Sequence, residues 1–295
     1  MDQRGRRQID PGRVHVIEAS AAPADPAERQ RRVREIALAL GRAVEDPKFR
    51  LPLLPETAAE ALQLANDPST PMNRLERVVS RDTALAARML TVATSPAYAG
   101  TGVRSLTAAL QRLGSGAVRD ILYQAVMECH VFRGNERAVR AEREHAVAVG
   151  AIARSLSGVL GFDPQYTFVC GLLHDLGRTA IHTLRDHEPL AGAADILDEI
   201  AEIVHPNLGA HMAARWKLPA LVIEGVRRHH RYRDFDEQGG YSQIGHVLAV
   251  SNLLAHRLGL GRPPAPETDA MLAPIYELGL DPVASLELAQ AAVRA

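Results

Sequence analysis

The sequence of 295 residues has little of several features that define common protein classes. Its two cysteines, Cys129 and Cys170, form no CxxC pair, which excludes a disulfide scaffold and favours buried thiols in a reducing cytoplasm. Aromatic residues make up only 4%, so aliphatic side chains must fill the core. Neither charge is in excess: the net charge is -1, which predicts no general attraction to nucleic acid or acidic membranes. No run approaches roughly 18 apolar residues, so we expect no membrane span.

What the chain does have is histidine, and its distribution is uneven. Of the 12 histidines, only His15 lies within the first 129 residues, and the others lie between His130 and His256. This skew arises by chance or marks a metal site in the second half of the chain. The N-terminus, MDQRGRRQIDPGRV, is charged and lacks an apolar run, so we expect no secretory signal.

Apolar residues recur at helical spacing along most of the chain, and breakers such as Asp46-Pro47 and Gly114 separate the helical stretches. No convincing alternation of apolar and polar residues predicts a strand. The sequence therefore predicts an all-α, two-lobed protein, with nearly all of the candidate chemistry in the second lobe. We expect a flexible leader at 1–28, a helical lobe at 29–133, a second helical lobe at 134–260 and a helical extension at 261–295.

The sharpest local pattern is GLLHDLGR, in which His174 and Asp175 follow an apolar helical run and precede a glycine. An imidazole nitrogen beside a carboxylate oxygen suits a divalent metal. Four further histidines accompany the pair, namely His145, His205, His229 and His230. Because consecutive helical residues point about 100° apart, the last two would serve neighbouring ions, or one ion and a substrate phosphate. Each histidine taken singly also fits a surface residue or a hydrogen-bonded core residue.

The order of these motifs resembles the HDOD family, the HD-related output domains of bacterial signalling. LPLLPETAAEALQLAND is similar to the family's opening, GLLHDLGR to its HD segment, and HPNLGAHMAARWKLPALVIEGVRRHH to its double-histidine segment. Asp82-Thr83 and Thr94-Ser95 stand where the family usually has Asp-Pro and Asn-Ser. The resemblance spans roughly residues 45–258 and implies an N-terminal helical lobe packed on an HD-like helical lobe.

The wider HD superfamily comprises metal-dependent phosphohydrolases whose ligands follow the order H, HD, H, HH, D. In this chain the resemblance implies the metal ligands His145, His174, Asp175, His205, His229 and His230. The final Asp falls on Asn252, whose neutral oxygen is a poorer ligand than a carboxylate, so we expect weakened metal affinity. The implied cofactor is a divalent transition metal (Zn, Fe, Mn or Ni) as one or two ions, and a metal-free protein stays an open alternative.

Two classes of function follow from the resemblance. HDOD domains are mostly regarded as signalling or scaffold modules, so we expect a regulatory protein that binds a signalling partner in trans or a nucleotide second messenger. The alternative is a metal-dependent phosphohydrolase or phosphodiesterase acting on a nucleotide or cyclic dinucleotide. There Asp175 would orient the attacking water and Arg178 would hold phosphate bidentately, although Arg178 also fits an ordinary arginine at a helix end.

The remaining histidines fit no ligand position, and we expect them to be surface or locally hydrogen-bonded residues: His182, His187, His211, His246 and His256. His130 is not expected to activate the adjacent Cys129, because neighbours on a helix point apart. Trp216 is expected to pack between the helices around the site. We expect no DNA, RNA or membrane partner and a cytoplasmic location, and the sequence does not indicate an oligomeric state.

Overall fold

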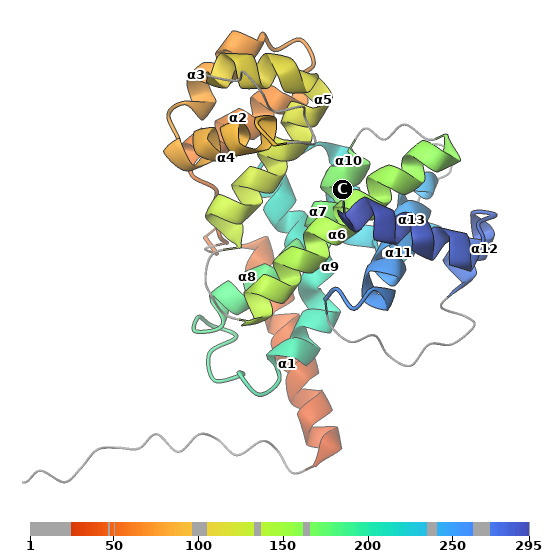
Figure 1. Cartoon of the computed structure of the whole chain (residues 1–295). Helices are drawn as coiled ribbons and strands as arrows, with labels where there is room; N and C mark the ends of the chain where they lie inside the picture. The colour runs from red at the N-terminus through yellow and green to blue at the C-terminus, as the bar shows by residue number, and fades with distance from the viewer. Residues whose placement is uncertain are drawn as a thin grey trace, which may run out of the picture.

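The computed structural model describes residues 25–46, 48–49, 51–95, 105–132, 137–161, 166–234, 241–261 and 272–294. Within these ranges all regular structure is helical, which confirms the predicted all-α class (Figure 1). The helices are α1 (Pro26–Glu45), α2 (Glu56–Asn66), α3 (Met72–Val79), α4 (Thr83–Ala93), α5 (Leu106–Val126), α6 (Arg137–Leu160), α7 (Thr167–Leu173), α8 (Leu176–Leu184), α9 (Leu197–Arg215), α10 (Ala220–Arg228), α11 (Tyr241–Arg257), α12 (Ala273–Glu277) and α13 (Pro282–Arg294), with short turns η2 (Met127–Val131) and η3 (Tyr232–Asp234). Most of the predicted leader, residues 1–24, lies outside the described part.

Capping residues in the sequence set where several helices begin. The Asp25 carboxylate accepts a hydrogen bond from the backbone N–H of Ala27 at 3.0 Å, directly before Pro26 in the first turn of α1. Asp82 and Ser105 cap α4 and α5 in the same way. Inside α5, Gly114 takes a φ of 74° that kinks the helix where the sequence predicted an end. These starts and breaks follow from local chemistry.

The helices form two lobes that share one continuous apolar core. Helices α2 to α5 make up the first lobe, at the top of Figure 1, and α6 to α11 form the body below it. The core runs from Leu85 and Leu122 in the first lobe to Leu172 and Val222 in the second. A smaller apolar cluster joins α6 and α11 to the C-terminal helices α12 and α13. The predicted lobe boundaries remain predictions, because a continuous core marks no division.

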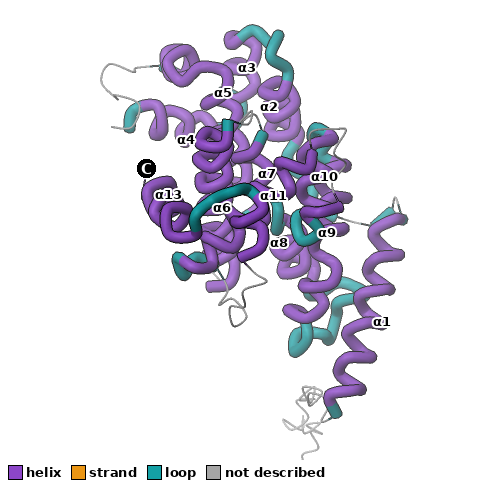
Figure 2. The backbone as a smooth tube through the Cα atoms, turned by 90° about the vertical axis from the view of Figure 1, so that its right-hand side faces the viewer, coloured by secondary structure: helices purple, strands orange, loops and turns teal. Residues whose placement is uncertain are grey.

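Helix α1 packs on α9 of the second lobe, although the sequence interpretation grouped it with the first lobe (Figure 2). Its buried face includes Leu40 and Val44. At its N-terminal end the Arg29 guanidinium lies 2.6 Å from Glu199, and Arg32 lies 3.2 Å from Asp195. Apolar burial along one face and ion pairs at one end therefore hold α1 against the helix that carries His205.

Helix α9 is a single helix of 19 residues with Pro206 inside it. Proline usually ends a helix, but Pro206 does not end α9. Proline removes one backbone N–H, so the carbonyl of Glu202 loses its helical partner, but packing on α8, α10 and α1 outweighs this loss. His205 therefore sits in the middle of a rigid helix.

The junction between the lobes is polar. The Arg154 guanidinium on α6 lies 2.5 Å from the Asp120 carboxylate on α5. Tyr166, which precedes α7, donates a hydrogen bond to the backbone carbonyl of Asn66 at 3.4 Å, and the Arg119 guanidinium lies 4.4 Å from the centre of its ring. Residues of α2 and α5 thus contact the chain immediately before α7.

Two glycine contacts bring the helices of the second lobe unusually close. A Cβ added at Gly171 would lie 2.7 Å from the Cα of Gly150, where α7 crosses α6. A Cβ added at Gly177 would lie 2.1 Å from the carbonyl oxygen of His205, where α8 crosses α9. Any side chain at these positions would push the helices apart. Glycine at Gly177 therefore determines how close α8 lies to His205.

We expect Gly177→Ala to destabilise the protein by about 3 kcal/mol, because the added methyl group meets backbone that cannot move alone. The matched control is Gly158→Ala on α6, where an added Cβ would meet nothing within 4 Å. That variant should gain about 0.5–1 kcal/mol from helix propensity. Thermal unfolding followed by circular dichroism measures both changes. Equal melting temperatures for the two variants would contradict the close crossing of α8 and α9.

Candidate metal centre

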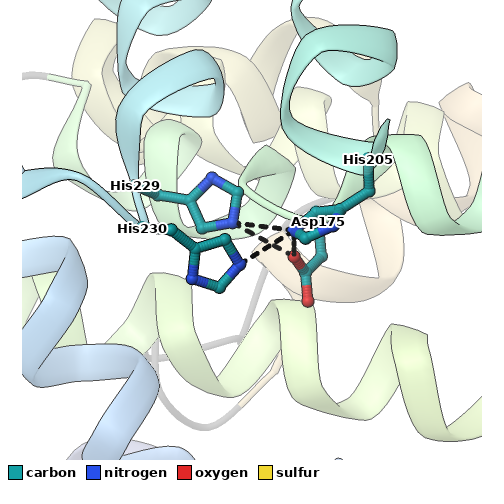
Figure 3. A group of neighbouring side chains, drawn as sticks. All are labelled: Asp175, His205, His229 and His230. Carbon is teal, nitrogen blue, oxygen red and sulfur yellow. Dashed lines mark hydrogen bonds and ion pairs between the residues drawn. The ribbon is translucent and has the colours of Figure 1, made fainter. Parts of the chain in front are cut away.

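Asp175 lies where α7 ends and α8 begins, and its carboxylate is the centre of a cluster of imidazoles (Figure 3). Its Oδ1 atom lies 3.1 Å from Nε2 of His205 and 3.3 Å from Nε2 of His229. Its Oδ2 atom lies 3.4 Å from Nε2 of His174 and 4.0 Å from Nε2 of His145. The carboxylate therefore faces one pair of histidines with each oxygen.

The cluster divides into two groups of ligand atoms that share Asp175. One group adds His205, His229 and His230, and the other adds His145 and His174; within each group the atoms lie within 4.8 Å of one another. Four of the five imidazoles are buried, whereas His230 is exposed. The structure thus brings together all six residues that the HD ligand order implied, with an opening to solvent at His230.

Backbone carbonyls orient the buried histidines. Nδ1 of each ring lies 2.7–3.0 Å from a carbonyl oxygen, that of Gly171 for His174, Ala201 for His205, Val226 for His229 and Leu260 for His145. A carbonyl oxygen only accepts hydrogen bonds, so each Nδ1 carries the proton. In the neutral rings the Nε2 atoms then present lone pairs to the cluster, the orientation that metal-binding histidines use.

The arrangement of these lone pairs fits a cation. Nε2 of His205 lies 3.1 Å from Nε2 of His229, so two acceptors face one another at hydrogen-bonding distance, and it lies 3.0 Å from Nε2 of His230. Nε2 of His145, Nε2 of His174 and Oδ1 of Asp175 are buried without a hydrogen-bond partner. Buried acceptors without donors are unfavourable, and a divalent ion satisfies several at once. The residues present therefore suit the metal that the resemblance implied.

Burial controls the charge of the cluster. It lowers the pKa of His145 and of His229 to about 4 and that of His230 to about 3, so these rings are neutral ligands at pH 7. Burial alone would raise the pKa of Asp175, but electrostatic attraction to His174 outweighs burial and holds that pKa well below its usual range. The cluster therefore offers one carboxylate and three rings held neutral, while Asp175 raises the pKa of His174.

Arg178 lies against the same carboxylate. Its side chain is buried, its Nε lies 3.2 Å from Oδ2 of Asp175, and its Nη2 donates to Glu202 at 2.9 Å. The guanidinium is therefore engaged by two carboxylates, and only Nη1 is buried without a partner. Arg178 partly neutralises the oxygen that faces His145 and His174. The sequence interpretation did not foresee either contact.

Asn252 lies on α11, and its side-chain oxygen is buried without a hydrogen-bond partner. One turn later His256 stacks on His145, with ring centroids 4.6 Å apart and an angle of 28° between the rings. Residues four apart share a helix face, so Asn252 belongs to the face of α11 that is turned towards the cluster. Sequence reasoning missed His256, although its spacing from Asn252 was a usable signal.

Other singled-out side chains lie in contacts apart from the cluster. His130 lies 2.9 Å from the Asp82 carboxylate, and His246 lies 3.1 Å from Glu277. The Trp216 indole donates to the carbonyl of Pro52 at 3.2 Å and so fixes the LPLLP segment to the end of α9.

Comparison with known proteins identifies the family. Residues 51–232 match the family model of the HDOD domain. The chain belongs to the HDOD domain family. Helix α1 and the helices α11 to α13 lie outside the matched residues. No described helix combines the length and apolar character that crossing a membrane requires.

Relatives and solved structures support this assignment of the fold. An uncharacterized protein of Treponema pallidum is 25% identical over 241 residues, which are 77% of this HDOD chain and 45% of that protein. Ribonuclease Y of Rhodopirellula baltica is 39% identical over 82 residues, 27% of this chain and 16% of that enzyme. The chain spans less than half the length of these relatives. An HDOD domain protein of Geobacter sulfurreducens has a TM-score of 0.64 at 21% identity, covering 88% of this chain and 90% of that one.

We expect the metal-free protein to lose stability as the pH falls from about 7 to about 5. The unfolded chain binds protons on histidine near pH 6.5, whereas His145 and His229 in the folded chain have pKa values of about 4. The unfolded state therefore takes up more protons in this window. At pH 5, each of these two histidines should lower the free energy of unfolding by about 2 kcal/mol. Asp175 does not contribute, because its lowered pKa acts only below about pH 4.

Urea unfolding after chelation, at pH 7 and at pH 5, measures this loss. His174 opposes it in part, because Asp175 outweighs burial and raises the pKa of His174. A His145→Gln His229→Gln variant should show a smaller pH dependence than the wild-type protein. An unfolding free energy that stays constant over the window would show that the buried rings are not held neutral.

Proposed function

We propose that this HDOD protein is a regulatory module built on a divalent-metal centre that holds one ion firmly and a second ion weakly. The observation that carries the proposal is the convergence of the Nε2 atoms of His229 and His230 on that of His205, at 3.0–3.1 Å. Oδ1 of Asp175 completes a set of three nitrogens and one oxygen, which suits Zn, Fe, Mn or Ni.

The second candidate ion site has less negative charge than the first. It consists of His145, His174 and Oδ2 of Asp175, with Asn252 where the superfamily order has a carboxylate. Oδ2 already lies 3.2 Å from the Arg178 guanidinium, which lowers its negative potential further. One carboxylate would thus have to offset two divalent ions. This shortage supports binding at the first position and partial binding at the second.

Metal analysis of protein purified without chelator tests the proposal. We expect about one transition-metal ion per chain, because only one position has four good ligands. His229→Ala His230→Ala should lose this ion, whereas His145→Ala should keep it. His187→Ala, at an exposed position, is the matched control. Wild-type protein that neither retains nor takes up Zn, Fe, Mn or Ni would refute the metal centre.

The regulatory part of the proposal rests on the family and on the incomplete ligand set. A module with a weak second ion suits ligand binding better than fast hydrolysis, which in two-metal sites relies on both ions. A nucleotide second messenger would reach the centre at the exposed His230, and a signalling protein in trans would read the outcome. A cyclic dinucleotide as messenger and the cytoplasm as location belong to the same proposal.

A phosphodiesterase is the second candidate, and the local similarity to ribonuclease Y favours it. A bound metal ion would polarise a phosphoryl oxygen as a Lewis acid. Asp175 would orient the attacking water, and Arg178 would hold Asp175 in place through its 3.2 Å contact. Although the net charge of -1 gives no general attraction to RNA, a single-stranded RNA is a reasonable substrate to test alongside cyclic dinucleotides.

We expect Asn252→Asp to bind a second ion and to raise any hydrolysis about 10-fold or more, because it restores the missing carboxylate. Turnover of bis(p-nitrophenyl) phosphate, cyclic di-GMP and a short RNA with added Mn²⁺ measures the effect. His174→Ala Asp175→Ala is the inactive control. If neither the wild-type protein nor Asn252→Asp shows turnover above this control, the phosphodiesterase candidate is wrong and the regulatory one stands.

A further inference from the structure

A groove runs between the second half of α1 and the middle of α9, and none of the candidate metal ligands lines it. Its volume is about 690 Å³, and apolar residues of both helices line it, among them Leu38, Gly41, Ile203 and Leu208. Leu38 is 62% exposed and Ile203 is 52% exposed. Two large aliphatic side chains are thus exposed to solvent within one concave surface. Isolated exposed apolar residues are common on proteins, but exposed apolar residues gathered in a groove indicate a binding surface.

Gly41 leaves the floor of this groove bare. It lies inside α1, where glycine lowers helix stability relative to alanine. An added Cβ would meet nothing within 4 Å, so neither α9 nor any other described segment requires glycine at this position. The missing side chain instead allows another helix to approach the backbone of α1 closely.

The rim of the groove carries unpaired positive charge. Arg34 and Arg42 are exposed and make no ion pair with any residue of the described ranges. Arg29 and Arg32, five and two residues before Arg34 on the same helix, do pair with carboxylates near the start of α9. Glu45 is the one carboxylate among the described lining residues. The rim is therefore complementary to an acidic ligand.

We propose that this groove binds an amphipathic helix of a partner protein, with an apolar stripe flanked by Asp and Glu. The groove follows α1 from Arg34 to Glu45, about three turns or 17 Å, which matches a partner helix of similar length. The apolar stripe would cover Leu38 and Ile203, and the acidic flanks would pair with Arg34 and Arg42.

Charge argues against the two occupants that this chain could supply. A second copy related by two-fold symmetry would place the same arginine rim against itself. The N-terminal segment 1–24 contains four arginines and only three acidic residues, so it carries the wrong sign. An acidic partner in trans has the right sign and needs no change in the groove.

Part of the groove lies outside the residues that match the HDOD family model. α1 lies outside residues 51–232, whereas α9 lies within them, so the groove exists only where α1 is present. Val204 and Leu208 line it and flank His205 along α9. A bound helix would therefore contact the same rigid helix that carries a metal ligand. The proposal does not depend on whether metal is bound.

Two designed helical peptides of about 14 residues test the proposal on the full-length protein. Both carry the same Leu and Ile stripe, flanked by Glu in one and by Lys in the other. Fluorescence anisotropy should show binding of the Glu peptide and at least about 10-fold weaker binding of the Lys peptide. The preference should shrink in 0.5 M salt, about the concentration at which exposed charges are screened within a few ångströms.

Gly41→Trp should weaken binding of the Glu peptide by about 10-fold or more, because the indole occupies the groove. Gly158→Trp is the matched control, since it is also an exposed helical glycine with nothing within 4 Å of its Cβ. Arg34→Glu Arg42→Glu should reverse the preference between the peptides, whereas Arg74→Glu on α3 should not. Circular dichroism checks that each variant is folded.

Several results would overturn the proposal. One is that the Glu peptide does not bind, or binds equally well to Gly41→Trp and to the wild-type protein. Another is a preference for the Lys peptide in the wild-type protein. A third such result would come from sedimentation analysis. If the wild-type chain is a dimer that Gly41→Trp dissociates, a second copy occupies the groove and the proposal of a partner helix is wrong.

Discussion

The second lobe is organised by one constraint: nitrogen lone pairs from several helices must meet at a single carboxylate. Three of the converging imidazoles are oriented by carbonyls of their own helical segment, as for His174 on Gly171, His205 on Ala201 and His229 on Val226. Each helix therefore fixes the ring that it carries, and only the positions of the helices remain to be set. Packing must hold those positions to within a few tenths of an ångström to keep the cluster together.

The glycine crossings meet that requirement. Gly177 lets α8 approach the backbone of His205, and Gly171 lets α7 approach α6 at Gly150. Backbone in direct contact leaves no side chain whose rotation could absorb a shift. The carboxylate and the imidazoles are thus placed by the stiffest parts of the chain. The same close packing explains why a proline inside α9 is tolerated next to His205.

Much of the fold could be predicted from the sequence, because helical periodicity, capping residues and breakers act locally. The resemblance of segments such as GLLHDLGR to a known family also implied which six residues would lie together, and the structure brings them together. What could not be predicted depends on tertiary packing: the continuity of α9 through Pro206, the docking of α1 on α9, and the stacking of His256 on His145. The contact of Arg178 with Asp175 also depends on tertiary packing. The sequence alone was equally compatible with Arg178 as an ordinary arginine at a helix end.

The shortness of α7 has a consequence for how the two lobes communicate. Tyr166, directly before its start, contacts Asn66 and Arg119 of the first lobe, and the seven-residue helix ends directly before His174. A helix of about 10 Å is short enough to be rigid, so a tilt of the first lobe would move His174 relative to the rest of the cluster. With an ion bound as proposed, metal affinity and lobe orientation would share one coupling free energy, so that a partner imposing the tilt that the ion favours would tighten the ion by the same factor.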